Sequence, residues 1–545
     1  MSKLRRIALY WNTMRHLRSQ QVFGRAVECI RRTAGLGRPA DPPASLHVPP
    51  ERSLPDVPER IRVENRTAQD AISEGTFVFL NDRRPLGRPV DWTPDAPALW
   101  TFHLHYFNYL PGLDRSLRAD LCRDWIQSNP AGSDPGWHPY PTSLRVINWC
   151  RAAPREPDIL GSLYRQASYL YRHVETHLLG NHLLENARAL VLAGHFFGEQ
   201  GEAPSWNERG LRIYRDETPE QVLGDGGHYE RSPMYHALVL EGYLDVLAVL
   251  PDEHPDRPFF DRTVRRMMDF LDALTHPNGR IALFNDSVQG EARLTHELRA
   301  YASEIIEHEP EAKAAFPETG YYVHDDEDLY LVIDAGPVGP DHLPAHAHAD
   351  IFSYELYLGD TPFIVDTGTY EYEPGPMRDY TRSTRAHNTV CVDGVDQAEC
   401  WDSFRVARRY APEDVTMHEH GDVVVFDGTF TGYAHLIGDG IVHRRCIRSS
   451  RRHRRVQVTD YVAGDGSHTV TSRLHLHPEV SVRLYEDGIR LASRERAIEL
   501  STGDSQVRLE KEWYCPEFGI RKKAPVLVVQ KRGRLPLQLR HTIQY

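Results

Sequence analysis

Residues 345–368 read AHAHADIFSYELYLGDTPFIVDTG, and this stretch decides how the chain is divided. In FSYELYLG and TPFIVDTG, apolar and polar residues alternate and turn residues follow, a pattern typical of antiparallel strands. Two histidines, His346 and His348, precede the first of these strands. Residues two apart on a strand face the same side, so both imidazoles would point the same way. That geometry suits a metal site, a catalytic pair, or one of each.

The strand pattern begins at about Tyr321 and continues to the C-terminus, through segments such as NTVCVDG, RVQVTDYV and APVLVVQKR. Between about residues 98 and 315, apolar residues instead recur every three or four positions, as in LLENARALVLAGHFF and YHALVLEGYLDVLAVL. A helical half followed by a β half predicts segregated domains and not a βαβ fold. We expect three regions, at residues 1–97, 98–320 and 321–545.

The first region has its own composition. Residues 1–33 predict one or two short amphipathic helices, and residues 34–60 contain seven prolines, which indicates an extended connector. The apolar run IALYW has only five residues, too short for the core of a signal peptide. We expect no transmembrane helix, because no run of about eighteen apolar residues occurs. The seven cysteines are scattered without a CxxC motif, which fits a reducing compartment. We therefore expect a cytoplasmic protein, with export by another route left open.

Overall composition limits the class of partner. The 545 residues are too many for one compact core, and their 40% apolar and 26% charged content is that of a globular protein. The net charge of −13 argues against a nucleic-acid-binding protein with a broad basic face. A local group of arginines can still create a positive cleft for an anionic substrate. The basic run IRSSRRHRR, at residues 447–455, is interpreted as a solvated strand edge.

Two helical motifs contain candidate functional residues. In GNHLLENARAL, at residues 180–190, Asn181, His182 and Glu185 share one helix face or its first turn. The same asparagine would also suit a simple helix N-cap. In DGGHYERSPMYHALVL, polar aromatic residues including Tyr235 crowd the start of an apolar helix. They would lie at the rim of a cleft near the positive end of the helix dipole, or belong to a capped helix with partly buried tyrosines.

The β half offers a metal set. Beyond the two histidines of AHAHAD, Asp366 ends one apolar strand and His387 begins another. Two histidines and a carboxylate from separate strands form a plausible Zn²⁺ site with one position left for water or another ligand. Two solvated strand histidines are the alternative.

Aromatic residues are dense in two further helical segments. These segments read WTFHLHYFNYL and WHPYPTSLRVINW and begin at Trp100 and Trp137. Interleaved polar residues make them either a sugar-binding platform or part of the core. The candidates for sugar contact are His105, Asn108, Trp137 and Tyr140.

Taken in order, NHLLEN, HYERSPMYH, HAHAD, IVDTG and RAHN resemble the heparinase II/III and alginate lyase superfamily of polysaccharide lyases. The match runs from about residue 98 to the end of the chain. The resemblance implies an α+β multidomain fold in which an incomplete α/α toroid precedes an antiparallel β-sandwich domain. The pattern of helices and strands agrees with this expectation independently.

The resemblance also implies roles for individual residues. Asn181 and His182 match the pair that contacts a uronate and neutralises its carboxylate, or that serves as base on one epimer. Glu185 matches a supporting acid. Tyr235 matches the general acid, or a residue that is both base and acid. His346 resembles the catalytic histidine contributed by the β domain.

His348, Asp366 and His387 resemble the family's metal ligands. The implied metal is mainly structural; zinc is favoured, and manganese would fit the same ligands. Because the implied substrate is an anionic uronic-acid polysaccharide or oligosaccharide, Arg231 and Arg385 are candidates to bind it.

The implied activity is β-elimination at a 4-linked uronate, as found in heparan sulfate, chondroitin, hyaluronan or alginate. Base and acid act on the C5 proton and the leaving O4, and no organic cofactor is required. A uronyl C5-epimerase is the main alternative, together with an exopolysaccharide-assembly protein of the same fold. A non-catalytic glycan-binding scaffold is disfavoured because the four candidate catalytic residues are all present, and a metal-dependent hydrolase would need the metal to activate water. The N-terminal segment would suit a lid, a homo-oligomer contact or a membrane-surface tether.

Overall fold

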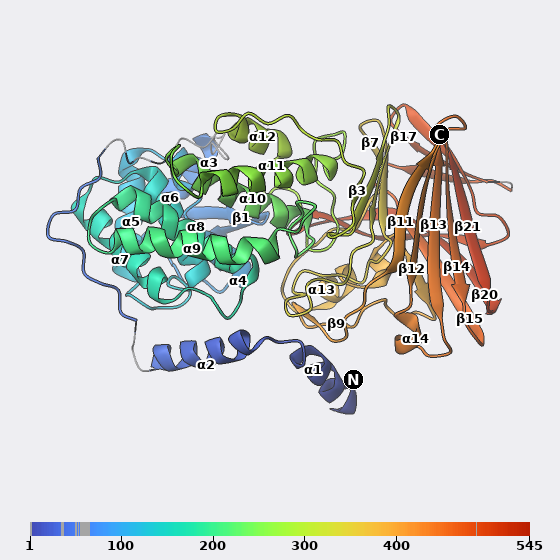
Figure 1. The fold of residues 1–545 in the computed structure, drawn as a ribbon, viewed down its shortest axis with the longest axis horizontal. Coiled ribbons are helices and arrows are strands. Elements are labelled where there is room, and N and C mark those ends of the chain that lie inside the picture. The colour runs from blue at the N-terminus through green and yellow to red at the C-terminus, as the bar shows by residue number, and fades with distance from the viewer. Residues whose placement is uncertain (1–2, 34–36, 50–51, 53, 55–65, 487) are drawn as a thin grey trace.

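The computed structural model describes residues 3–33, 37–49, 52, 54, 66–486 and 488–545. A helical domain and a β domain lie side by side, and two N-terminal helices run beneath them (Figure 1). These helices, α1 (Lys3–Met14) and α2 (Ser19–Thr33), confirm the helices predicted within residues 1–33. In the predicted connector, the described residues 37–49, 52 and 54 contain no α-helix or strand. The rest of residues 34–60 lies outside the described part.

The helical domain is built from nine helices, eight of which contact one another in two series. They are α4 (Ala98–Tyr106), α5 (Arg115–Ser128), α6 (Pro139–Ala152), α7 (Pro157–Arg172), α8 (Gly180–Phe197), α9 (Ala203–Gln221), α10 (Pro233–Val249), α11 (Arg257–Ala273) and α12 (Thr295–Ser303). Helices α4, α6, α8, α10 and α12 contact in sequence, and α5, α7 and α9 form a second series. Two nested series of alternating helices are the arrangement of an α/α toroid. Helices α8 and α10 of the first series are buried on nearly all sides, as expected of inner helices.

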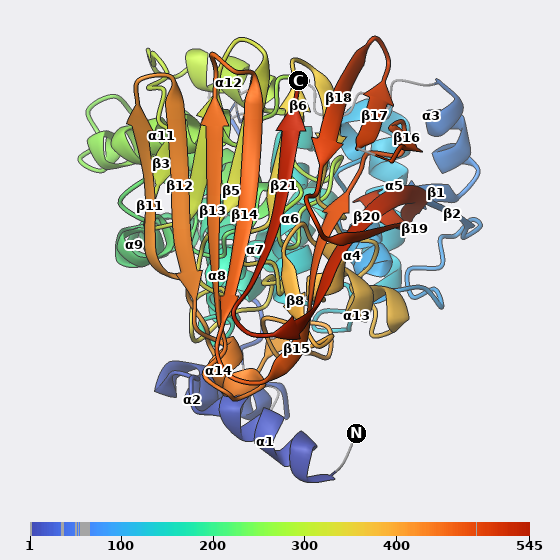
Figure 2. The ribbon, with the colours of Figure 1, turned by 90° about the vertical axis from the view of Figure 1, so that its right-hand side faces the viewer.

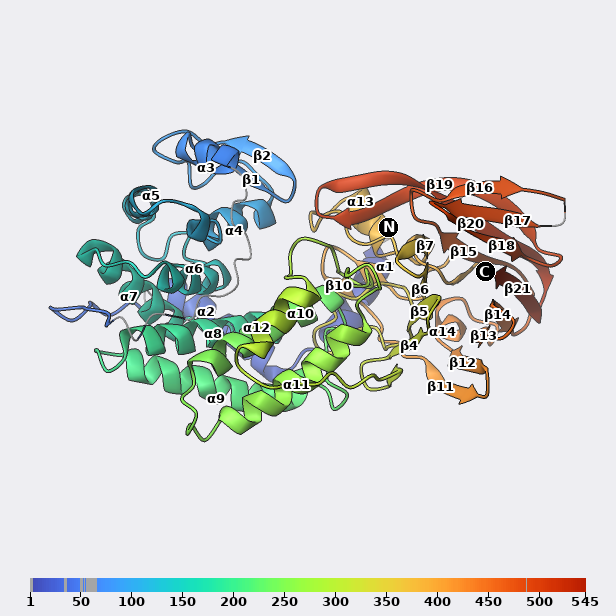
Figure 3. The same ribbon diagram turned by 90° about the horizontal axis from the view of Figure 1, so that it is seen from above.

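A small unit before the toroid was not predicted. It consists of α3 (Arg66–Ser73) and a hairpin of β1 (Thr76–Phe79) and β2 (Asp82–Pro85), at the edge of the helical domain (Figure 3). The hairpin turn holds Leu80 and Asn81 at φ values of +53° and +59°. Turns with two positive φ values usually contain Asn-Gly or Asp-Gly, and Leu-Asn gives no such signal.

The β domain begins with a five-stranded antiparallel sheet whose strands follow chain order. They are β3 (Ala315–Phe316), β4 (Tyr321–Asp325), β5 (Leu329–Asp334), β6 (Tyr354–Leu358) and β7 (Thr361–Ile364). One face of this sheet packs on Phe270 and Leu274 at the end of α11, and the other joins the core of the β domain. Every residue of β5 and β6 is therefore buried. The predicted boundary at residue 320 lies between β3 and β4, and the division into domains stays a prediction.

Two further sheets complete the β domain. The eight-stranded sheet is seen face-on in Figure 2. In spatial order its strands are β11 (Glu413–His420), β12 (Val423–Phe430), β13 (Val442–Ser450), β14 (Arg455–Ala463), β21 (Leu537–Gln544), β18 (Arg496–Ser501), β17 (Ile489–Ser493) and β16 (Ser481–Leu484). The four-stranded sheet contains β19 (Gln506–Glu517), β20 (Ile520–Arg534), β15 (Ser467–His475) and β8 (Val390–Val392). One apolar core joins all three sheets, as in a sandwich.

Shorter elements lie between these sheets. A two-stranded pair, β9 (Cys400–Trp401) and β10 (Arg405–Val406), and the helices α13 (Pro376–Thr381) and α14 (Tyr433–Leu436) connect them. The basic run at residues 447–455 spans the turn between β13 and β14, where residues 451–455 are exposed. Within the described chain, no helix has the length and apolar character needed to cross a membrane.

Candidate active site

A cleft of about 1380 Å³ lies where the helical and β domains meet. Asn181, His182 and Glu185 reach it from the first turns of α8, and Tyr235 from the first turn of α10. His346 reaches it from the segment between β5 and β6. The structure thus brings together the five residues that the sequence marks as catalytic or supporting.

Glu230 orients Asn181. The carboxylate accepts hydrogen bonds from the Asn181 backbone N at 3.1 Å and from Nδ2 at 2.8 Å. Burial opposes ionisation of Glu230, but His228, His346 and the hydrogen bonds from Asn181 outweigh it and lower its pKa. Because Nδ2 carries two hydrogens, one remains to donate to a ligand. Gly180 is required here, since a Cβ at this residue would lie 2.2 Å from Glu230 Oε1.

His182 is paired with a carboxylate behind it. Its Nδ1 lies 3.3 Å from both carboxylate oxygens of Glu175. Burial favours the neutral ring, but the Glu175 carboxylate dominates and raises the pKa of His182. Two of the predicted sugar-contact residues, Asn108 and Tyr140, line the cleft. The ring of Tyr140 lies 4.2 Å from that of His182. An imidazole whose protonated form Glu175 favours therefore forms part of this wall, beside an aromatic ring.

Glu185 belongs to a buried charge network between α8 and α10. Its carboxylate lies 3.0 Å from Arg188 Nη1, and Arg188 also pairs with Glu241 and Asp245. Burial raises the pKa of Glu185, and Arg188 counteracts this in part. The network holds the two helices that present Asn181 and Tyr235 in fixed relation.

Tyr235 contacts two side chains of the β domain. Ser232 caps α10 by accepting a hydrogen bond from the Tyr235 backbone N at 3.3 Å. The Tyr235 hydroxyl lies 3.1 Å from that of Tyr372, and its ring centroid lies 3.9 Å from that of His346. Burial, followed by the neighbouring Tyr372, raises the pKa of Tyr235 well above its ordinary value. The phenol is therefore neutral and able to donate a proton.

Asp286, between α11 and α12, contacts both histidines of AHAHAD. Its carboxylate lies 3.1 Å from His346 Nδ1 and 2.9 Å from His348 Nε2, and it accepts a 2.7 Å hydrogen bond from Arg378 Nη2. Burial opposes its charge, but Arg378 and the two histidines hold the pKa of Asp286 well below the ordinary value. An ionised carboxylate only accepts, so His346 donates from Nδ1 and His348 from Nε2. The lone pairs remain on His346 Nε2 and His348 Nδ1.

The two histidines therefore lie at different sites, but not through the strand geometry expected from the sequence. Residues 345–350 form no strand, and the rings use opposite nitrogens to contact one carboxylate. His346 lies in the cleft, with Nε2 3.9 Å from Glu230 Oε2. His348 is fully buried behind it, and burial lowers its pKa to about 4, so its imidazole is neutral.

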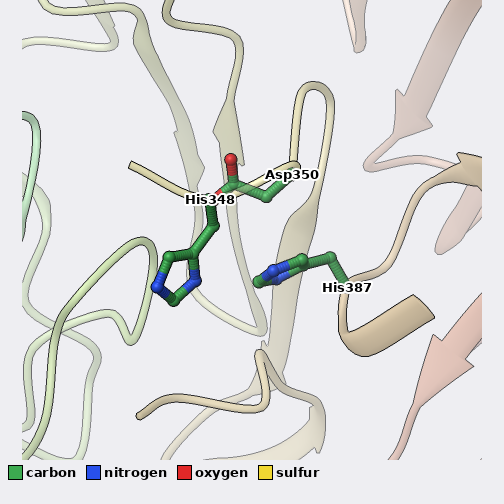
Figure 4. A group of neighbouring side chains, drawn as sticks. All are labelled: His348, Asp350 and His387. Carbon is green, nitrogen blue, oxygen red and sulfur yellow. The ribbon is translucent and has the colours of Figure 1, made fainter. Parts of the chain in front are cut away.

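His348, Asp350 and His387 form a group that could hold a metal ion (Figure 4). Their candidate ligand atoms lie within 4.8 Å of one another. Each residue has one buried polar atom without a hydrogen-bond partner: His348 Nδ1, Asp350 Oδ2 and His387 Nε2. A divalent cation would satisfy all three, so these residues fit a metal.

The third member of this group differs from the prediction. Asp366 Oδ2 lies 2.8 Å from His387 Nδ1, on the side of the ring away from the unpartnered Nε2. Burial opposes the charged ring, but Asp366 raises the pKa of His387 to about 9. Asp366 thus orients the His387 ring, while Asp350 takes the third place in the group that could hold a metal ion. Because Asp350 lies in an irregular segment, strand periodicity gave no indication of it.

Two arginines predicted to bind substrate are absent from the described residues that line the cleft. Arg231 donates to the backbone carbonyls of Thr319 at 3.0 Å and Tyr229 at 2.9 Å, so it secures a loop. Arg385 forms an ion pair with Glu512 elsewhere on the β domain. Both lie near catalytic segments in the sequence, but that proximity does not place them in the cleft.

Two predicted sugar-contact residues belong instead to the core. Trp137 is buried, and its Nε1 donates to the carbonyl of Asn129 at 3.0 Å. His105 is also buried, with Nε2 2.9 Å from the Trp92 carbonyl and Nδ1 accepting from Trp125. Aromatic density alone did not separate core residues from cleft residues.

Several residues of the site were given no functional role in the sequence analysis. Asp286 lies in ALFNDSV, where three polar residues interrupt an apolar run, a signal that could have identified it. Glu230 lies inside a quoted motif but was given no role. Tyr372 and Arg378 gave no local signal, because their importance comes from contacts with Tyr235 and Asp286 across the domain boundary.

Two family models together match residues 158–541, most of the helical region and nearly all of the β region. "Heparinase II/III N-terminus" matches residues 158–311, and "Heparinase II/III-like, C-terminal" matches residues 308–541. The chain belongs to the heparinase II/III-like family. The resemblance inferred from the sequence motifs is thereby confirmed.

Individual relatives of this heparinase II/III-like chain are distant. The heparin-sulfate lyase of Pedobacter heparinus is 26% identical over 50% of this chain and 47% of the relative, so the chain spans about half its length. FtsZ-localized protein C of Caulobacter vibrioides is 25% identical over 74% of this chain and 73% of the relative. A crystal structure of heparinase III aligns with a TM-score of 0.68 at 18% identity, over 93% of this chain and 87% of the other. This likeness confirms the toroid and β-sandwich fold.

Proposed function

We propose that this protein is a lyase that cleaves 4-linked uronic-acid polysaccharides by β-elimination. The observation that carries the proposal is the pairing of Tyr235 with His346, whose ring centroids lie 3.9 Å apart in a cleft that also contains Asn181 and His182. The name of the Pedobacter relative, a heparin-sulfate lyase, supports a glycosaminoglycan as substrate.

The cleft residues supply the functions that this reaction needs. The C5 proton of a uronate is weakly acidic, and its removal builds negative charge on the adjacent carboxylate. The remaining amide hydrogen of Asn181 and the ring of His182, whose protonated form Glu175 favours, are suitable donors for that charge. His346, whose Nδ1 faces Asp286, would take the C5 proton on Nε2.

Tyr235 would complete the elimination. As a neutral phenol it donates a proton to O4 while the C4–O4 bond breaks and the C4–C5 double bond forms. His346 then carries one additional proton and Tyr235 lacks one. Transfer of a single proton between them, directly or through solvent, restores the starting state, and no water is consumed.

We further propose that the group of His348, Asp350 and His387 holds a divalent metal. Two imidazoles and a carboxylate favour zinc, and manganese would fit the same ligands. When bound, the metal would supply a fixed coordination centre two residues from His346. Its role is structural in this proposal, and no reaction step above uses it.

The test is ultraviolet absorbance during incubation with heparan sulfate, chondroitin sulfate, hyaluronan and alginate. Growth of the conjugated unsaturated-uronate band is expected for at least one glycosaminoglycan, and its absence from all four would contradict the proposal for these polymers. The same reactions in deuterated water identify the main alternative. Deuterium at C5 without chain cleavage would assign the cleft to a C5-epimerase, and cleavage with saturated ends would indicate a hydrolase.

A further inference from the structure

The two N-terminal helices have their apolar side chains on the solvent side. On α1, Ile7, Trp11 and Met14 are 65%, 69% and 59% exposed. On α2, Phe23 and Ile30 are 70% and 60% exposed. The spacing of four and three residues on α1, and of seven on α2, places each set along one helix face. Both helices therefore present an apolar stripe outward.

This concentration is unique among the described residues. Fifteen large hydrophobic residues are exposed there, and eight of them fall within residues 7–30. The eight are Ile7, Tyr10, Trp11, Met14, Val22, Phe23, Val27 and Ile30. Single exposed apolar residues are ordinary, but a contiguous group marks an interaction surface.

The opposite faces of the helices are fixed to the domains. Thr13 of α1 accepts a hydrogen bond from Trp401 Nε1 at 3.1 Å and donates to the Val406 carbonyl at 3.2 Å. Gln21 of α2 donates to the His342 carbonyl at 3.1 Å. These hydrogen bonds fix the helices to the protein, and on α1 they are joined by buried Leu9 and by the ring of Tyr10, whose centroid lies 4.8 Å from that of Trp401. The outward direction of the apolar stripe is therefore set by docking.

Charge indicates what covers this surface. Residues 1–33 contain eight Lys or Arg and one Glu, a net of +7, so the other 512 residues carry −20. Among the described basic side chains, those of Arg6, Arg15, Arg18 and Arg25 are exposed, and Arg18 forms an ion pair with Glu220. Pairing this surface with a second copy would bring two +7 segments together, which electrostatic repulsion disfavours. An anionic lipid surface complements both the charge and the apolar stripe.

We propose that α1 and α2 form a peripheral membrane-binding surface that docks on anionic lipid bilayers. The apolar stripe, with Trp11 and Phe23, would insert about 5–10 Å into the headgroup and acyl boundary. The basic residues would contact lipid phosphates. This surface is independent of the proposed lyase activity.

Vesicle co-sedimentation of the full chain tests the proposal. Wild-type protein is expected to bind vesicles of phosphatidylcholine with 30% phosphatidylglycerol and to bind pure phosphatidylcholine at least tenfold more weakly. The triple variant Trp11→Ser, Phe23→Ser, Ile30→Ser should lose at least tenfold in binding. A matched variant, Tyr461→Ser with Leu509→Ser, removes exposed apolar residues from the β domain and should bind like wild type.

Tryptophan fluorescence of the wild-type protein gives a second test, which does not depend on whether the triple variant folds. Trp11 is strongly exposed, whereas six of the other tryptophans are buried, so brominated lipid should quench Trp11 selectively. The Trp11→Phe variant should lose this quenching. Failure of wild-type protein to bind anionic vesicles, or unchanged binding by the triple variant, would overturn the proposal. A concentration-dependent dimer that the triple variant abolishes, without vesicle binding, would make the surface a self-association interface instead.

Discussion

The helical domain and the β domain hold their site residues in different ways. In the helical domain, Asn181 and Tyr235 lie in the first turns of α8 and α10, where the helix backbone sets their place, Glu230 orients the Asn181 amide and Ser232 caps α10. In the β domain, His346 lies in an irregular segment between β5 and β6. Its orientation depends on buried charges, those of Asp286 and Arg378.

This difference predicts different sensitivities. The residues of a first helical turn are held because their carbonyls accept hydrogen bonds from the N–H groups four residues further on, so a single side-chain change leaves the backbone geometry in place. A loop oriented by a buried ion pair loses that orientation when one charge is removed, because the partner charge stays buried and uncompensated. The β side of the cleft should therefore be the more fragile.

The largest effect is expected for Asp286→Asn. Leaving Arg378 without its partner should lower the free energy of unfolding by about 3–5 kcal/mol, and His346 should lose its set tautomer. Asp460→Asn is the matched control, because Asp460 pairs with buried Arg445 inside the sandwich, away from the cleft. Urea unfolding should show comparable destabilisation of both variants, whereas turnover per folded molecule should fall only in Asp286→Asn.

A second substitution separates the loss of stability from the loss of turnover in Asp286→Asn. Asp286→Asn combined with Arg378→Met removes both charges and should recover much of the stability without recovering turnover. Recovery of turnover as well would show that Asp286 acts on stability alone.

Tyr235→Phe addresses the helical side. Loss of the proposed proton donor should reduce turnover by about 10²–10⁴-fold, while thermal unfolding and polymer binding stay near wild type. Tyr410→Phe, outside the residues that line the cleft, is the hydroxyl control. Turnover within a few-fold of wild type would remove Tyr235 from the mechanism.

Substitutions in the candidate metal group would distinguish Asp350, expected to bind the metal, from Asp366, expected only to orient His387. In metal analysis of purified protein, Asp350→Asn and His348→Ala are expected to lose the bound ion and thermal stability. Asp366→Asn should retain it with affinity weaker by about 10- to 100-fold. The reverse order of the two Asp variants would restore Asp366 as the third ligand.

The smallest effect is expected for Arg385→Gln. Its ion pair with Glu512 is partly exposed, so the free energy of unfolding should change by about 1 kcal/mol or less. Turnover should equal that of wild type at low and high substrate concentration. A raised KM would return Arg385 to the substrate-binding residues.

The fold could be predicted because helix and strand periodicities are local properties of the sequence. The same periodicity placed Asn181 and Tyr235 at the starts of apolar helices, and the family resemblance supplied the roles expected of them. Asp286 could not be assigned its role, because its partners His346 and Arg378 lie 60 and 92 residues away. His105 and Trp137 were misplaced because composition does not reveal whether an aromatic residue faces a cleft or the core.

Asp286 also constrains how such a chain can evolve. It lies in the helical half of the sequence, yet the groups that it orients, His346, His348 and Arg378, all belong to the β half. Neither half encodes a complete site, so an exchange of one domain for another would have to preserve this buried contact. Selection for activity therefore acts on the two halves as one heritable unit, and recombination between them would succeed only where both partners of the contact are kept.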